Sequence, residues 1–238
     1  MSLIQRFEAE ILDIKDLTPT VKYFKLSVPK TFTFKSGQFV GVYFLLGNEK
    51  KINRPYSIAS QPNKKGFIEL CIKRVNSGVG SNILHSLKNR DKLSIQGPLG
   101  GFTIRESSFK KDIIFIASGT GISTFKSMIP DILESGFKNK ILLLKGFRDE
   151  NEILYEKEFT ILKKKYKNLK FYNILSQPIR GIPAYNIGYV QDFLDKYIPN
   201  DFNGDFYLCG LSGMINNVKD SLLKKGFNEN QIFFERYD

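Results

Sequence analysis

The sequence has 238 residues, of which 42% are hydrophobic and 25% are charged, with a formal net charge of +12. This length and composition fit one large or two modest globular domains, each able to form a core without disulfides. Two cysteines are too few for a disulfide framework or a four-thiolate iron–sulfur cluster, and no apolar run approaches the roughly 20 residues that cross a membrane. Because the N-terminal residues also lack a secretory signal, we expect a soluble, cytoplasmic protein with no membrane span.

The positive charge is concentrated in the first part of the chain. Residues 1–107 contain 17 basic and 8 acidic side chains, whereas the remainder contains 19 and 16. Such an excess suits an acidic partner or an anionic ligand, although a generally lysine-rich composition explains it equally well. The lysines are scattered and form no basic motif interleaved with aromatic residues, so we do not expect nucleic acid to be the partner.

The first hundred residues are predicted to form β-strands. Six short segments are rich in β-branched and aromatic residues, several alternate between apolar and polar positions, and Gly, Pro, Asn and Lys separate them. This pattern predicts a small antiparallel β-barrel with one short helix over SNILHSLKN. The expected strands are EAEILDIKDL, VKYFKLSV, GQFVGVYFLL, RPYSIAS, FIELCIKRV and KLSIQG.

From about Lys111 the pattern changes to continuous apolar strands that alternate with amphipathic helices. DIIFIAS, ILLLKGF, FYNILS, DFYLCG and QIFFE are the strands, and helices are expected between them. This alternation predicts an α/β domain with a parallel sheet and helices on both faces. We therefore expect two domains, residues 1–107 and residues 108–238. Ligands of such sheets bind beyond the carboxyl ends of the strands.

The segment RPYSIAS (residues 54–60) carries a cation, an aromatic ring and a hydroxyl at close spacing. In a strand, Arg54 and Tyr56 share a face, and Ser57 faces the other way unless the strand bends. A guanidinium binds phosphate through two hydrogen bonds, and a tyrosine ring stacks on a flat heterocycle. The alternative is an edge strand that carries Arg and Ser incidentally.

Two glycine-containing turns precede predicted helices. In GVGSNIL (residues 78–84), Ser81 is expected to cap a helix whose first amides suit a phosphate, although plain capping explains the pattern as well. In IASGTGIS (residues 116–123), Gly119 and Gly121 allow close approach to a pyrophosphate, although a tight turn is the alternative. Thr124 stands where the G-x-G-x-x-G pattern requires a third glycine.

DFYLCGLSGM (residues 205–214) ends a buried strand with a cysteine and a glycine-rich turn. This position is the carboxyl edge of the predicted sheet, where a ligand is expected. Cys209 is therefore a candidate site residue, and the alternative is a small buried apolar residue.

Six motifs occur in one order: RPYSIAS, GVGSNIL, GPLG, SGTGIS, CGLSGM and a terminal FERYD. This order and spacing resemble the plant-type ferredoxin-NADP reductase superfamily of FAD- and NAD(P)-binding oxidoreductases. The resemblance extends from GQF (residues 37–39) to the last residues. It implies a flavin-binding barrel followed by a nicotinamide-binding domain.

The resemblance implies that one group of residues binds FAD. Arg54 is similar to the arginine that holds the FAD pyrophosphate, and Tyr56 to the ring that stacks on the isoalloxazine. Ser57 is similar to the hydroxyl near flavin N5 and is a candidate catalytic residue. The remaining FAD-binding candidates are Pro55, Gly80 and Ser81.

A second group is implied to bind the nicotinamide dinucleotide and to take part in catalysis. Cys209 and Gly210 match the pair beside the nicotinamide ring, and Glu235 matches a carboxylate near the flavin. Tyr237 is similar to the terminal aromatic that covers the flavin and moves aside for nicotinamide, although one further residue, Asp238, follows it here. The phosphate loop is represented by Gly119, Thr120 and Gly121.

The residues that select between NADH and NADPH depart from the pattern of NADP-using relatives. Ser176 and Tyr189 are kept, but Gln177 and Ile187 replace the two cations that bind the 2′-phosphate in those relatives. Arg180 lies three residues beyond Gln177 and is a candidate substitute. We therefore expect NAD(P)H as co-substrate, with NADH favoured.

The implied function is an FAD-dependent NAD(P)H oxidoreductase that passes electrons to a separate small acidic carrier, ferredoxin or flavodoxin. This chemistry requires neither a metal nor a protein nucleophile, and we expect the single histidine, His85, to be structural. A flavin reductase or the reductase component of an oxygenase system is the first alternative. An electron-relay or non-catalytic subunit of a larger complex is the second.

Overall fold

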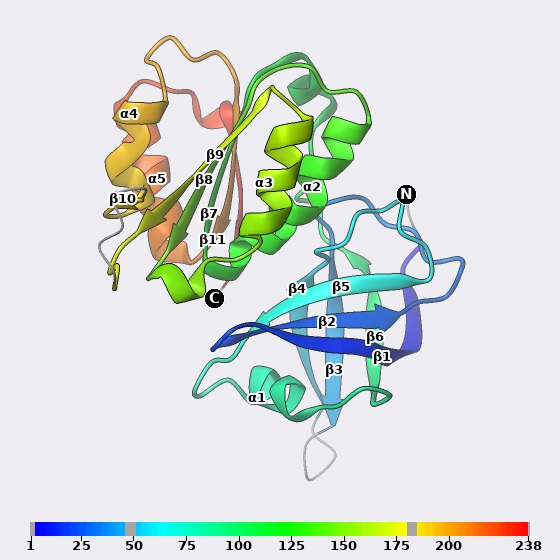
Figure 1. The fold of residues 1–238 in the computed structure, drawn as a ribbon. Coiled ribbons are helices and arrows are strands. Elements are labelled where there is room, and N and C mark those ends of the chain that lie inside the picture. The colour runs from blue at the N-terminus through cyan, green and yellow to red at the C-terminus, as the bar shows by residue number, and fades with distance from the viewer. Residues whose placement is uncertain (1–2, 46–50, 180–184, 238) are drawn as a thin grey trace. The chain divides into compact units, whose positions relative to one another are not determined.

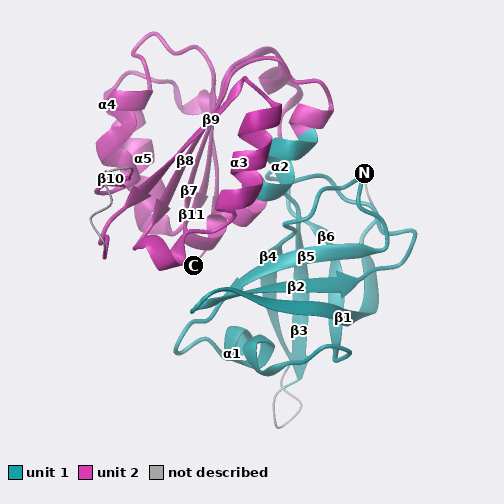
Figure 2. Cartoon of the chain, viewed as in Figure 1, with its two compact units in different colours: residues 1–103, 126–131 teal, residues 104–125, 132–238 magenta. Residues whose placement is uncertain are grey.

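The computed structural model describes residues 3–45, 51–179 and 185–237, which form two compact units. Unit 1 contains residues 1–103 and 126–131, and unit 2 contains residues 104–125 and 132–238 (Figure 2). The boundary that we expect between residues 107 and 108 remains a proposal.

Unit 1 is an antiparallel barrel, as the sequence predicts (Figure 1). Its six strands follow the order β4-β3-β6-β1-β2-β5. An isolated antiparallel bridge joins Ile58, the residue after β4, to Leu70 of β5, so the two ends of this strand order lie next to each other. The strands are β1 (Gln5–Thr18), β2 (Val21–Ser27), β3 (Phe39–Leu45), β4 (Lys51–Ser57), β5 (Phe67–Lys73) and β6 (Lys92–Leu99).

The barrel core is formed by alternate residues of these strands. In β3, Val40, Val42 and Phe44 are buried and belong to the core, whereas Leu45 is exposed. This alternation is the period-2 pattern of a strand with one face on a core. Helix α1 (Val79–Ser86) adds Leu84 to the same core.

The middle of helix α2 (Ile122–Glu134) belongs to unit 1 and makes polar contacts there. Ser127 donates to the carbonyl oxygen of Ser60 over 2.6 Å, and Lys126 Nζ lies 2.5 Å from Glu69 Oε2. Glu69 Oε1 also accepts from the hydroxyl of Tyr23 at 3.1 Å. These contacts join the middle of α2 to the strands of the barrel.

Unit 2 is built on a six-stranded parallel sheet in the order β10-β9-β8-β7-β11-β12, which confirms the predicted α/β class. β10 is a two-residue strand that the sequence pattern does not predict. The strands are β7 (Ile113–Ser118), β8 (Ile141–Phe147), β9 (Leu169–Leu175), β10 (Asn186–Ile187), β11 (Asp205–Gly210) and β12 (Ile232–Arg236).

Helices cover both faces of this sheet, again as predicted (Figure 1). On one face, Phe125 of α2 packs on Phe115 at 4.8 Å between ring centroids, and Phe159 of α3 lies 6.1 Å from Phe171. The other face is covered by α4 and α5 through a buried aliphatic cluster. The helices are α2 (Ile122–Glu134), α3 (Glu156–Lys165), α4 (Leu194–Tyr197) and α5 (Ser212–Lys224).

One lysine is fully buried in this sheet. Lys145 of β8 places Nζ 3.0 Å from Oε2 of Glu156 and 4.6 Å from the ring centroid of Phe171. Desolvation lowers the pKa of Lys145, and the charge of Glu156 opposes that shift. One carboxylate and two aromatic rings thus surround the buried amine and favour its charged form against desolvation.

Within the described part of the chain, none of the helices combines the length and apolar character needed to cross a membrane.

Candidate functional site

The carboxyl ends of β7 and β11 mark the point where the strand order of unit 2 reverses. From β7 the chain continues through β8 and β9 on one side, and it returns to β11 on the other side. Ligands of open α/β sheets bind beside such a reversal. The predicted turns IASGTGIS and DFYLCGLSGM follow these two strands, so the structure brings both candidate motifs to this edge.

Two of the glycines are required by close backbone approach. A Cβ atom on Gly121 would lie 2.2 Å from the carbonyl oxygen of Cys209, and one on Gly210 would lie 2.2 Å from Oγ of Ser118. Gly210 also has a φ of +148°, which L side chains rarely adopt. The turn (η3, Gly119–Gly121) therefore packs directly against the end of β11.

Gly119 and Thr120 lie in the same turn but have a different role. Gly119 has a φ of +53°, and a Cβ atom there would meet no atom within 4 Å. The backbone of this turn is thus open on the Gly119 side, as a loop that approaches phosphate must be. The predicted roles of Gly119, Thr120 and Gly121 toward a pyrophosphate remain predictions.

Cys209 is fully buried at the end of β11. Its Sγ donates to Oγ1 of Thr124 over 3.5 Å, and Thr124 Oγ1 lies 2.7 Å from the hydroxyl of Tyr237. Burial, together with the smaller effect of the Glu235 charge, raises the pKa of Cys209 to about 12, whereas hydrogen bonding with Thr124 and Tyr237 opposes the shift. The thiol is therefore neutral at physiological pH.

Glu235 and Tyr237 reach Cys209 from the last strand of the sheet. Glu235 is the register partner of Cys209 in the parallel pair β11–β12. The amide N–H of Tyr237 donates to the carbonyl oxygen of Gly210 over 2.9 Å. The structure thus gathers Cys209, Gly210, Glu235 and Tyr237, which the sequence places in two separate motifs.

Thr124 is a member of this group that sequence reasoning does not single out as a site residue. It is fully buried in the first turn of α2, and its hydroxyl contacts both Cys209 and Tyr237. In the sequence it appears only as a departure from a glycine pattern.

The predicted specificity residues lie farther along the same edge of the sheet. The amide of Ser176 donates to the carbonyl oxygen of Phe147 over 3.0 Å, which places Ser176 just beyond β9. Tyr189 is 61% exposed, and Ile187 lies in the short strand β10. Arg180, the candidate cation, lies outside the described residues.

Arg148 is a cation at this edge that sequence reasoning missed. Its Nε donates to Oε1 of Gln177 over 3.0 Å, and the amide of Gln177 donates to the carbonyl oxygen of Arg148 over 2.7 Å. Arg148 directly follows β8, so the signal available in the sequence was an arginine immediately after a buried strand.

In unit 1, the side chains of Arg54 and Tyr56 converge on Gly80. A Cβ atom on Gly80 would lie 2.9 Å from Cγ of Arg54 and 3.4 Å from the hydroxyl of Tyr56. Arg54 pairs with Val42 and Tyr56 with Val40, so both side chains lie on the same face of β4, as the strand period predicts. The absence of a side chain at Gly80 therefore lets α1 approach β4 closely.

The neighbours of Arg54 and Tyr56 in the motif are in different environments. Pro55 is exposed, whereas Ser57 is buried and pairs with Phe39. Burial raises the pKa of Tyr56 to about 12, opposed by the charge of Arg54, so its ring is neutral. Arg54 is exposed and donates to the carbonyl oxygen of Asn53 over 2.8 Å. Its guanidinium is thus accessible to an anion.

The expected capping role of Ser81 is wrong. Helix α1 begins at Val79 with Gly78 as N-cap residue, and Ser81 lies inside its first turn. The hydroxyl of Ser81 donates to the carbonyl oxygen of Gly78 over 3.0 Å and accepts from the amide of Val75 over 3.1 Å. The helix begins earlier than predicted because the loop folds back on itself, and Ser81 fixes that loop.

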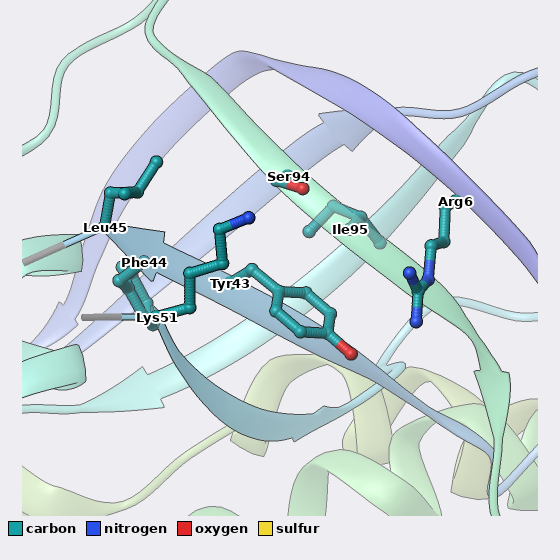
Figure 3. A pocket seen from close by; sticks show the side chains of 7 residues that line it. All are labelled: Arg6, Tyr43, Phe44, Leu45, Lys51, Ser94 and Ile95. Carbon is teal, nitrogen blue, oxygen red and sulfur yellow. The ribbon is translucent and has the colours of Figure 1, made fainter. Parts of the chain in front are cut away.

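A hollow of about 260 Å³ lies elsewhere on the barrel (Figure 3). Tyr43 and Leu45 are among its lining residues, and in β3 they alternate with Val42, the register partner of Arg54. The hollow therefore contains none of the predicted site residues. It is lined by Arg6, Tyr43, Phe44, Leu45, Lys51, Ser94 and Ile95.

His85 hydrogen-bonds through Nε2 to the carbonyl oxygen of Ile72 at 3.0 Å. Desolvation lowers its pKa, which favours the neutral ring. This environment fits the structural role expected from the sequence. Among the residues with described positions, no group of three or more His, Cys, Asp or Glu side chains is arranged to hold a metal ion.

Two domain families match the chain, one on each side of residue 107. Residues 8–104 match the oxidoreductase FAD-binding domain family, and residues 115–220 match the oxidoreductase NAD-binding domain family.

Known proteins resemble this chain over nearly its whole length. It is 32% identical to ferredoxin–NADP reductase B of Sorangium cellulosum, with 98% of each chain covered. It is 34% identical to the phenol hydroxylase P5 protein of Acinetobacter pittii, covering 99% of this chain and 66% of that protein. The chain thus spans about two thirds of this relative. The crystal structure of the Amycolatopsis cytochrome P450 reductase GcoB has the same fold, with a TM-score of 0.90, 22% identity, and coverage of 99% of this chain and 71% of that one.

Proposed function

The chain belongs to the ferredoxin–NADP reductase superfamily of FAD- and NAD(P)-binding oxidoreductases, and from this membership we propose that it oxidises NAD(P)H and delivers electrons to a separate small carrier. The observation that carries this proposal is the cluster of Cys209, Gly210, Glu235 and Tyr237 at the strand-order reversal of unit 2. This is the position where a dinucleotide binds in such sheets.

The residues of unit 1 fit an FAD. An exposed guanidinium at Arg54, a neutral ring at Tyr56 and the close approach of the α1 backbone at Gly80 suit a pyrophosphate and a flat heterocycle. We propose that Arg54 binds the pyrophosphate, that the α1 amides at Gly80 and Ser81 bind it from the other side, and that Tyr56 stacks on the flavin ring. Pro55 keeps β4 extended between these two side chains, since its ring fixes φ.

The residues of unit 2 fit a nicotinamide dinucleotide. We propose that Gly119, Thr120 and Gly121 bind its pyrophosphate through their backbone, and that Ser176 and Tyr189 bind its adenosine end. The Cys209 side chain, neutral and fully buried, forms an apolar wall that excludes water from the nicotinamide ring. Glu235, beside it in register, supplies a negative charge that favours the positively charged nicotinamide product.

When bound, FAD supplies the redox chemistry: it would accept two electrons as a hydride and pass them on one at a time. The contribution of the chain is positioning and the exclusion of water, because reacting atoms must approach to roughly 3–3.5 Å. Ser57, buried in β4, is proposed to hydrogen-bond the reacting edge of the flavin. Cys209 is not proposed to act as a nucleophile, since its raised pKa keeps it a thiol.

The proposed electron acceptor is a small acidic protein, ferredoxin or flavodoxin. The support is the basic excess of residues 1–107, which contain 17 basic and 8 acidic side chains. Complementary charge accelerates encounter between such partners and makes the rate fall with salt. A cytoplasmic location is part of the same proposal and is tested by cell fractionation.

A second candidate function is the reductase component of an oxygenase system. The observation that favours it is the 34% identity with the phenol hydroxylase P5 protein, of which this chain spans 66%. The two functions differ in the acceptor and not in the chemistry at the nicotinamide. A flavin reductase that releases reduced flavin is a third outcome, distinguished by whether the flavin stays bound during turnover.

The test begins with the purified chain. It should be yellow, release FAD and no FMN on heating, and oxidise NADH or NADPH with ferricyanide as acceptor. A colourless chain that takes up no flavin would refute the proposal in favour of a non-catalytic subunit. Cytochrome c reduction that depends on added ferredoxin or flavodoxin, and falls with salt, would then separate the carrier function from the oxygenase function.

A further inference from the structure

Three side chains from three elements meet at the end of the parallel sheet in unit 2. The hydroxyl of Thr124 in α2 lies 2.7 Å from the hydroxyl of Tyr237, which follows β12. The thiol of Cys209 in β11 donates to the same Thr124 oxygen over 3.5 Å. These residues are 113 and 85 positions apart from Thr124 in the sequence.

Thr124 has the chemistry of a connector in this cluster. Its side chain is fully buried, so its hydroxyl must be satisfied by protein groups. A threonine hydroxyl has one proton and two acceptor lone pairs, which allows it to serve both the thiol and the phenol. Thr124 therefore links the thiol of Cys209 to the phenol of Tyr237 through one oxygen atom.

Tyr237 is held both through its backbone and through its side-chain hydroxyl. The backbone amide of Tyr237 donates to the carbonyl oxygen of Gly210 over 2.9 Å, and its hydroxyl is held by Thr124. The side chain is only partly buried, so the phenol can exchange this partner for water if the ring swings out. The Thr124 hydroxyl is therefore the polar anchor of the ring.

We propose that Thr124 is a positioning residue that latches Tyr237 beside the thiol of Cys209 and so opposes entry of the nicotinamide ring. The proposal rests on the proposed function, in which nicotinamide approaches Cys209. The ring of Tyr237 and the nicotinamide compete for the space beside that thiol. Binding of the dinucleotide then requires the Thr124–Tyr237 hydrogen bond to break, and the strength of this bond sets part of the affinity.

The main test is dinucleotide affinity of the flavin-loaded protein, measured by calorimetric titration with NAD⁺ and NADP⁺. Thr124→Val keeps the shape of the side chain and removes the hydroxyl, and Tyr237→Phe removes the other partner. Each variant should bind the preferred dinucleotide about 2- to 10-fold more tightly, the range that one neutral hydrogen bond supplies. The double variant should match the single variants, because both remove the same bond.

Two matched variants separate the latch from a general packing effect. Thr124→Ser keeps the hydroxyl and should bind the dinucleotide like the wild type. Ser123→Ala removes a buried hydroxyl from the adjacent position of the same helix and should also leave the affinity unchanged. Equal tightening in Ser123→Ala would overturn the proposal.

A second measurement does not depend on the dinucleotide. Hydrogen exchange at the amide of Tyr237, followed by mass spectrometry of the C-terminal peptide, should be about 2- to 10-fold faster in Thr124→Val than in the wild type. Unchanged exchange would overturn the latch itself. If exchange is faster in Thr124→Val but the wild-type protein binds no dinucleotide, both the proposed function and the effect of Thr124 on dinucleotide entry are refuted. If Thr124→Val exchanges faster but binds the dinucleotide with wild-type affinity, only the claim that the latch opposes nicotinamide entry is refuted.

Discussion

Arg148 donates from Nε to Oε1 of Gln177 over 3.0 Å, and this contact joins the loops that follow β8 and β9. Gln177 occupies the position where NADP-using relatives are expected to carry a cation. The structure thus places the Arg148 guanidinium next to Gln177, from the loop that follows the neighbouring strand β8. Both side chains are exposed and can reorient toward a ligand.

This arrangement leads to a prediction on cofactor choice. We expect kcat/KM to favour NADH or to differ by less than about tenfold, which corresponds to roughly 1.4 kcal/mol. Arg148→Ala should lower kcat/KM for NADPH about tenfold or more relative to NADH, because a charge-assisted contact contributes about 1.5–3 kcal/mol. Arg180→Ala is the matched variant, since a loss confined to it would identify Arg180 as the substitute cation. A wild-type kcat/KM that favours NADPH by more than about tenfold would refute the expected preference for NADH.

A second prediction concerns the retention of FAD. Arg54→Ala should weaken FAD binding about 10- to 100-fold, because the proposed contact with the pyrophosphate is charge-assisted. The measurement is a fluorescence titration of the apoprotein with FAD. Lys92→Ala removes another exposed cation of the same barrel, one that pairs with Glu8 at 2.8 Å, and should not change the affinity. Equal weakening in both variants would point to a general charge effect.

The residues at the end of β11 and β12 should act on hydride transfer and not on flavin binding. Cys209→Ala and Glu235→Ala should slow anaerobic bleaching of the flavin by NADH about 10- to 100-fold, as misplacement of reacting groups does. The FAD content should stay that of the wild type. Stopped-flow absorbance provides the rates, and wild-type rates in both variants would mean that these residues have no such role.

A fourth prediction follows from the contact between Gly121 and Cys209. Because a Cβ atom on Gly121 would lie 2.2 Å from the Cys209 carbonyl oxygen, Gly121→Ala must separate α2 from β11. We expect a loss of about 1–3 kcal/mol in the free energy of unfolding in urea. Gly213→Ala is the control, since the Cβ position of Gly213 in α5 meets nothing beyond its own helix within 4 Å, and this variant should be neutral or stabilising. Equal stability of the two variants would contradict the close approach.

The fifth prediction concerns the buried pair of Lys145 and Glu156. Glu156→Gln removes the only carboxylate described within 4 Å of Lys145 Nζ and should cost about 1–3 kcal/mol at pH 7, a moderate loss because the Glu156 side chain is 42% exposed. Burial depresses the pKa of Lys145 in the folded state. The folded protein therefore gains stability relative to the unfolded chain as pH rises toward the ordinary lysine value of 10.5.

The destabilisation in Glu156→Gln should consequently be largest near neutral pH and should shrink between pH 7 and pH 10. Urea unfolding at several pH values measures it. Lys145→Met is the matched variant, because an apolar side chain of similar length needs no counter-ion, and should show a weaker pH dependence than Glu156→Gln. A penalty in Glu156→Gln that does not change with pH would contradict the depressed pKa.

The order of the elements and the class of both units could be predicted from the sequence. Alternating apolar residues, as in GQFVGVYFLL, report a strand with one face on a core, whereas continuous apolar runs such as DIIFIAS report a strand buried on both faces. These are local periods, so they need no knowledge of the partner strand. The same holds for the glycine turns, because a strand followed by glycine and a helix restricts the backbone locally.

Only the tertiary structure decided which side chains share a site. In the sequence, Thr124 is noticeable only because it stands where a glycine pattern requires its third glycine. In the structure, its hydroxyl contacts both Cys209 and Tyr237, because the end of β11 and the residues after β12 lie beside the start of α2. Arg148 becomes relevant because parallel pairing places the ends of β8 and β9 side by side. The sequence predicts a start of α1 at Ser81, which is wrong, because the Ser81 hydroxyl hydrogen-bonds to Val75 and Gly78 in the preceding loop. The residue types around Ser81 do not indicate these contacts. Periodicity reports that a residue is buried, but contacts between residues distant in the sequence are set by strand order and register, which local patterns do not encode.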